Sequence, residues 1–144
     1  MTIEESLKIN GVHLATPIGD SMEPTLKGWR DNVVIKPVID PLKVNDVVLC
    51  KKNDGQYVLH RIIKIKNGKY YLRGDNQRVC DKSYTKENVI GKLVGFYKKE
   101  KYVDVNAFSY RFYVVFWRFI FPIRFIFSCF KSLFKRIKKW SSVY

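Results

Sequence analysis

Short apolar runs separated by turn residues dominate the first two thirds of the chain. Val33–Ile35 and Val47–Cys50 are rich in β-branched residues, and Pro37 and Pro41 lie between them, which predicts two strands joined by a loop. Three further strands are predicted at residues 56–66, 68–75 and 88–97. The first two of these begin at Asp-Gly and Asn-Gly pairs, which favour hairpin turns. No convincing amphipathic helix is expected in the first 97 residues, so the pattern predicts a mostly β, antiparallel domain.

The pattern changes after the charged segment 98–104, which reads as a break between two parts of the chain. About half of residues 110–130 are aromatic, and Arg111, Arg118 and Arg124 are spaced among them. A basic run follows and extends to residue 139. We therefore expect a domain at residues 1–104 and a helical, membrane-associated segment at residues 105–144.

The charge distribution supports a membrane role for this second segment. The net charge is +14, and residues 98–144 contribute nine of those positive charges. Three arginines and Pro122 disfavour a transmembrane span, so we expect residues 106–139 to lie in the membrane interface as two half-helices, with basic side chains against anionic headgroups. A span and a buried helix are the alternatives. Bulky apolar residues interrupt the basic ones, so no nucleic-acid partner is expected.

The same charges bear on the side of the membrane that the protein contacts. If the tail spanned the bilayer with the domain inside, the basic residues 135–139 would lie outside, against the positive-inside tendency. Binding in the plane of the cytoplasmic face avoids this conflict and is favoured. The competing arrangement places the domain outside and the basic end inside.

The cysteines exclude two classes of site. Cys50, Cys80 and Cys129 include no CxxC pair and belong to no His/Cys cluster. This spacing argues against a disulfide framework and against structural zinc, so neither a metal nor a cofactor is predicted.

Candidate chemistry begins at residues 19–25, GDSMEPT. Ser21 is either a turn serine or a nucleophile, and a serine nucleophile needs a base. Strand alternation places His60 on one face with Val58 and Ile62, where it is either a structural histidine bonded to a backbone carbonyl or a general base. Asp75 and Asp81 follow in LRGDNQRVCD; each is a candidate to orient the imidazole or is an ordinary loop acid.

Five ordered sequence blocks between residues 16 and 97 carry a family resemblance: GDSMEPTLKGWRDNVVI, DVVLCKK, VLHRIIKI, YLRGDNQRVCD and NVIGKLVGF. They resemble the type I signal peptidases and the LexA-like self-cleaving repressors, which share one β-rich peptidase fold. A histidine in the run His60-Arg61-Ile62 and a Gly-Asp-Asn loop resemble the archaeal and endoplasmic-reticulum type of signal peptidase.

The resemblance implies a role for each candidate residue. Ser21 corresponds to the nucleophile, His60 to the base and Asp81 to the partner of the histidine, while Asp75 corresponds to a structural or secondary acid. The backbone amide of Ser21 would belong to the oxyanion hole. Some relatives add a serine hydroxyl where this chain has Gly19, so the hole would rest on backbone donors, and Met22 would shape the turn.

The function implied is that of a membrane-associated serine endopeptidase of the signal peptidase type. Its partner would be a leader or precursor peptide presented near the bilayer. Two alternatives stay open: a catalytically inactive, membrane-bound binding module of the same fold, and a self-cleaving LexA-like peptidase.

Overall fold

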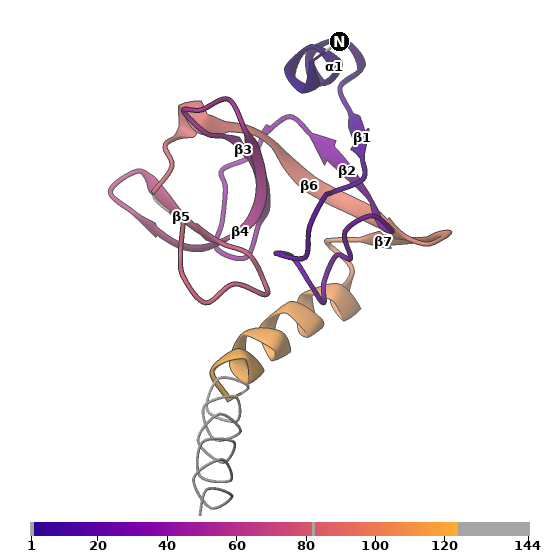
Figure 1. Ribbon diagram of the computed structural model, residues 1–144, viewed down its shortest axis with the longest axis vertical. Helices are drawn as coiled ribbons and strands as arrows, with labels where there is room; N and C mark the ends of the chain where they lie inside the picture. Colours follow the sequence, from indigo (N-terminus) through magenta and orange to yellow (C-terminus); the bar gives the residue numbers. More distant parts are fainter. Residues whose placement is uncertain (1, 82, 124–144) are drawn as a thin grey trace, which may run out of the picture. The chain divides into compact units, whose positions relative to one another are not determined.

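The computed structural model describes residues 2–81 and 83–123 of the chain, which divides into two compact units, Met1–Ala107 and Phe108–Tyr144. The first unit contains one α-helix, seven strands and one 3₁₀ turn in its described part (Figure 1). In chain order these elements are α1 (Ile3–Asn10), β1 (His13–Ala15), β2 (Asn32–Lys36), β3 (Val47–Lys51), β4 (Tyr57–Lys66), β5 (Lys69–Arg73), η1 (Lys86–Asn88), β6 (Val89–Lys98) and β7 (Lys101–Asp104).

The strands form one antiparallel sheet in the order β1-β2-β6-β3-β4-β5, and β7 pairs with β6. The five strands predicted from the sequence are all present, as β2 to β6, so the prediction of a β-rich fold is confirmed. The interpretation of residues 98–104 as a break was wrong, because residues 101–104 form β7 after a turn in which Lys99 has a φ of 59°. The three-residue strand β1 was not predicted either.

The expectation that the first 97 residues hold no helix was also wrong. α1 begins after Thr2, whose hydroxyl accepts a hydrogen bond from the Glu5 amide at 3.2 Å while the Glu5 carboxylate accepts one from the Thr2 amide at 2.8 Å. Gly11 ends the helix in the left-handed conformation, with a φ of 67°. The capping box and the terminal glycine were the sequence signals for this helix. Its eight residues are too few for the helical periodicity of apolar positions to be recognised.

A compact apolar core holds β3, β4 and β5 together and thereby positions the site. Its buried members are Leu42, Val48, Cys50, Ile62, Leu72 and Tyr84. β3 pairs with residues 57–61 of β4, whereas β5 pairs with residues 61–66. In the described part of the chain, residues 57–60 of β4 therefore form a strand edge on the side away from β3.

The described part of the second unit, residues 108–123, is helical and includes Pro122. Its exposed apolar side chains include Phe108, Phe112, Phe116, Phe119 and Ile123. The rings of Phe108, Phe112 and Phe116 are stacked, with centroids 6.4 and 6.3 Å apart. Among the described residues, no helix has the length and apolar character that crossing a membrane requires. The predicted second half-helix and Cys129 lie outside the described residues.

Candidate active site

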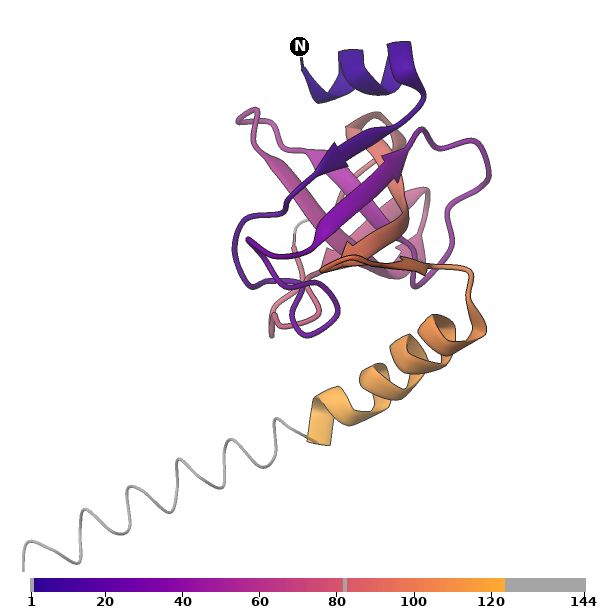
Figure 2. The ribbon, with the colours of Figure 1, turned by 90° about the vertical axis from the view of Figure 1, so that its right-hand side faces the viewer.

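Ser21 lies in the long loop between β1 and β2. Figure 2 shows this loop at the end of β1 that is remote from α1. Met22 and Leu26 are buried, and the Leu26 amide donates a hydrogen bond to the Met22 carbonyl at 3.0 Å. The Glu23 amide donates to the Asp20 carbonyl, also at 3.0 Å. These tight turns fix the backbone on both sides of Ser21.

His60 joins the serine to an acid. It lies on β4 opposite Val48, and its side chain is buried. The Nε2 atom of His60 is 3.1 Å from the hydroxyl of Ser21, and its Nδ1 atom contacts a carboxylate oxygen of Asp81. The structure therefore brings together Ser21, His60 and Asp81, the three residues that the resemblance pairs.

The hydrogen bond with Asp81 decides which ring nitrogen of His60 carries the proton. An ionised carboxylate only accepts hydrogen bonds, so the proton of the neutral ring belongs on Nδ1, where it is donated to Asp81. The Nε2 lone pair then faces the hydroxyl of Ser21. The Asp81 backbone is held by its amide, which donates to the Leu72 carbonyl at 2.8 Å. This arrangement is suited to removing the hydroxyl proton of Ser21.

Asp75 lies close in sequence but has a different environment. Its carboxylate accepts two hydrogen bonds from the Arg61 guanidinium, at 2.7 and 2.6 Å, and one from the Thr25 hydroxyl at 2.5 Å. The Arg61 side chain also donates to the Asn45 carbonyl at 2.9 Å. Both charged side chains are 6 % exposed. Asp75 thus links β4 to the Ser21 loop. Of the two roles that the resemblance implies for Asp75, structural or secondary, these contacts fit the structural one.

The loop after β5 approaches the backbone of Ser21 very closely. The Asn76 amide donates to the Ser21 carbonyl at 2.9 Å. A Cβ atom on Gly74 would lie 2.4 Å from the same carbonyl oxygen, closer than any real contact of that kind. Glycine at this position is therefore a condition for the loop to hold Ser21 where it is.

An apolar cavity of about 320 Å³ lies beside Ser21. Gly19, Ser21 and Met22 line it at one end, and Ile3 and Tyr57 also line it. The remaining walls come from the loop between β1 and β2 and from β1, β2, β3 and β4; the strand residues include His13, Ala15, Val33, Ile35, Leu49, Val58 and Leu59. Asp75 is not among the lining residues. Gly19 has a φ of 89°, a left-handed conformation that suits glycine.

Cys50 is a free, buried cysteine of the core, and its environment keeps the thiol protonated. Burial, reinforced by the negative charge of Asp81, raises the pKa of the Cys50 thiol to about 12. A thiol with that pKa carries almost no thiolate near neutral pH, so Cys50 is not a reactive nucleophile. Among residues 2–81 and 83–123, no cluster of three or more His, Cys, Asp or Glu side chains is arranged to hold a metal ion.

Comparison with known protein families identifies the family of this chain. A family model described as Peptidase S24-like matches residues 6–94, a stretch that includes Ser21, His60 and Asp81. The chain belongs to this family. No curated protein matches the sequence.

Membership in the Peptidase S24-like family supports a serine peptidase activity in general. The β-rich fold agrees with it, and so does the contact of His60 with both a serine and an acid. Sequence reasoning missed the residues that support this peptidase site. Arg61 is separated from Asp75 by 14 positions, and nothing local predicts their pairing. The Gly-Asp-Asn motif was the only signal for the role of Gly74.

Proposed function

We propose that the protein is a membrane-associated serine endopeptidase of the signal peptidase type, similar to its archaeal and endoplasmic-reticulum members. Ser21 is the nucleophile, His60 the general base and Asp81 the group that orients it. One observation carries this proposal: His60 contacts the Ser21 hydroxyl with one ring nitrogen and the Asp81 carboxylate with the other.

The reaction follows from this geometry. Nε2 of His60 takes the Ser21 hydroxyl proton as the oxygen attacks the carbonyl carbon of the scissile peptide bond. The Ser21 amide lies next to the developing oxyanion, and one such donor accounts for about 3 kcal/mol of transition-state stabilisation. The imidazolium then gives its proton to the leaving amine as the C–N bond breaks. Water, deprotonated by the same histidine, hydrolyses the acyl-enzyme and restores the Ser21 hydroxyl.

The cavity beside Ser21 supports a peptide substrate in extended conformation. β1 pairs only with β2 in the described part of the chain, so its outer side is a strand edge. Residues 57–60 of β4 form the second edge, and both β1 and β4 line the cavity. An extended chain lying there can pair its backbone with a strand edge, while apolar side chains enter the cavity.

The exposed aromatic stripe supports the membrane part of the proposal. Phe108, Phe112, Phe116 and Phe119 fall on one side of the helix of residues 108–123, and the exposed Arg111 and Arg118 lie along one border of that side. Aromatic side chains with arginines beside them suit the interface of an anionic bilayer, and we place the protein at the cytoplasmic face. Sedimentation with anionic and with zwitterionic vesicles tests this; equal recovery in both supernatants would contradict it.

A comparison of native N-termini tests the peptidase. Membranes are prepared from host cells that express the wild type, Ser21→Ala or the matched control Ser83→Ala. We expect uncleaved precursors to accumulate only with Ser21→Ala, and their cut sites then identify the substrate. Identical N-termini in all three would contradict the proposal and favour a catalytically inactive binding module.

Self-cleavage is the second candidate, because the matching family is described as S24-like and the resemblance extends to self-cleaving repressors. Intact-mass measurements on the purified wild type and on Ser21→Ala separate it from cleavage of another protein. Two fragments that arise at a rate independent of protein concentration, and only in the wild type, would establish self-cleavage in cis.

A further inference from the structure

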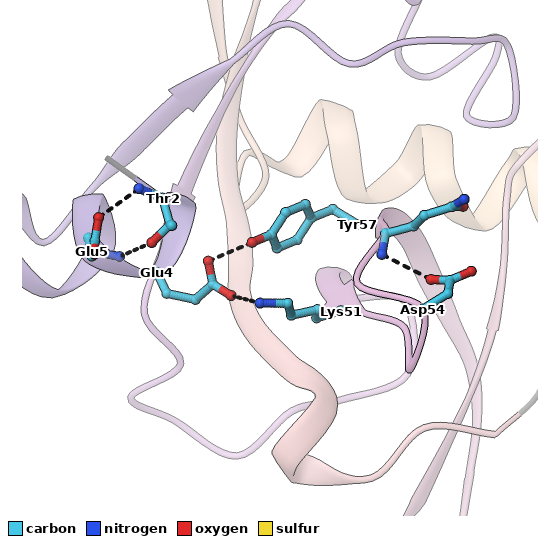
Figure 3. Close-up of polar contacts among 7 residues, drawn as sticks. Thr2, Glu4, Glu5, Lys51, Asp54 and Tyr57 are labelled. Carbon is cyan, nitrogen blue, oxygen red and sulfur yellow. Dashed lines mark hydrogen bonds and ion pairs between the residues drawn. The ribbon is translucent and has the colours of Figure 1, made fainter.

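A single carboxylate fastens the N-terminal helix to the hairpin that β3 and β4 form. Glu4 of α1 accepts a hydrogen bond from the Tyr57 hydroxyl at 2.7 Å and pairs with the Lys51 ammonium at 2.7 Å (Figure 3). Lys51 is the last residue of β3, and Tyr57 is the first residue of β4. The turn between them is closed by hydrogen bonds of its own, including one from the Gln56 amide to Asp54 at 2.9 Å. The attachment point is therefore rigid.

The Glu4 contacts attach α1 at one end of the cavity beside Ser21. β1 leads from α1 towards the Ser21 loop, and β4 leads from Tyr57 to His60, so the two strands run along the cavity from the same end. Ser21 lines the cavity at one end and is 3.1 Å from His60, whereas Ile3 and Tyr57 line it where α1 meets β4. Figures 1 and 2 show α1 at the end of the strands opposite the Ser21 loop. Glu4 thus joins the two sides of the cavity at the end remote from the nucleophile.

We propose that α1 is a strap that closes the far end of the substrate cleft and selects substrates by the length of chain that the cleft must hold. This inference rests on the proposed peptidase function. Tyr57 and His60 are three positions apart on β4, which corresponds to about 10 Å of strand. About three substrate residues fit between Ser21 and the closed end. A longer segment has to displace the first turn of α1, where Ile3 and Glu4 lie.

The ion pair that attaches α1 stays charged near neutral pH but contributes little stability. Its hydrogen bonds with Lys51 and Tyr57 lower the pKa of Glu4 to about 2, and the bond with Glu4 raises the pKa of Lys51, so the ion pair persists across neutral pH. The Lys51 and Glu4 side chains are 46 % and 36 % exposed, and pairs this exposed contribute little and are screened by salt. Leu7 is buried and anchors the second half of the helix. Opening therefore requires release of the first turn only.

Two serine-reactive probes of different length test the strap on the full-length protein. Ethyl fluorophosphonate is shorter than the cleft, whereas a fluorophosphonate on a decyl chain with a polyethylene glycol–biotin arm has to pass its far end. The Ser21 labelling rates are compared for wild type, Glu4→Gln, Lys51→Met and the control Glu5→Gln. The control removes the same charge one position away and keeps a side chain that serves the capping box.

We expect Glu4→Gln and Lys51→Met to speed labelling by the long probe about two- to five-fold, with the short probe unchanged. Glu5→Gln should change neither rate, and raising the salt concentration should accelerate only the long probe in the wild type. Equal rates of long-probe labelling in wild type, Glu4→Gln and Lys51→Met would overturn the proposal that α1 closes the cleft and leave the peptidase proposal standing. Failure of even the short probe to label wild-type Ser21 would overturn the proposed function together with the strap.

Discussion

Removing one partner of the buried ion pair between Arg61 and Asp75 should strongly destabilise the first unit. Asp75→Ala leaves the guanidinium of Arg61 in a site where the side chain is 6 % exposed, without the carboxylate that accepts two of its hydrogen bonds. It also removes the acceptor of the Thr25 hydroxyl. An uncompensated buried charge of this kind costs about 3–5 kcal/mol, and burial leaves little room for solvent to screen it.

Urea denaturation followed by circular dichroism measures this loss. We expect the free energy of unfolding of Asp75→Ala to fall by about 3–5 kcal/mol, against less than about 1 kcal/mol for Glu4→Ala, whose ion pair is exposed. The double variant Arg61→Met/Asp75→Ala should lose less than the sum of its two single variants, because the stranded charge is gone. A loss below about 1 kcal/mol for Asp75→Ala, or strict additivity in the double variant, would refute this reasoning.

Two further predictions follow from the loop and the helix that border the cleft. Gly74→Ala forces its Cβ atom against the Ser21 carbonyl. We therefore expect the free energy of unfolding to fall by about 1–3 kcal/mol and Ser21 to be labelled more slowly by ethyl fluorophosphonate. An unchanged labelling rate would show that the loop does not position the serine. The folded-state pKa of Glu4, about 2, is below its ordinary value of 4.5, so its contribution is complete above pH 4.5 and is lost as the pH falls towards 2. The stability difference between wild type and Glu4→Gln, measured by urea denaturation, should therefore be constant at pH 5–7 and shrink below pH 4.5; a difference that grows in acid would contradict the assignment.

The sequence by itself determined the elements whose signals are local. β-branched runs bounded by Asp-Gly and Asn-Gly turns were sufficient for β2 to β6, because strand alternation and turn chemistry depend on near neighbours. Family-like blocks were sufficient to name Ser21, His60 and Asp81. α1, β1 and β7 were missed since each is short, and the helix shows itself only through its capping box.

The tertiary structure alone decided which of these residues meet. The Ser21 hydroxyl reaches His60 across 39 sequence positions, and Asp75 turns towards Arg61 and Thr25 while Asp81 turns towards His60. Nothing local distinguishes the two acids, because their surroundings are set by β-strand register and by the close approach of Gly74 to the Ser21 loop. The attachment of Glu4 to Lys51 and Tyr57 spans about 50 positions for the same reason: cross-strand order brings β1 and β4 to opposite sides of one cavity. Long-range contacts within the sheet therefore place Ser21, His60 and Asp81 together, which the sequence alone could not show.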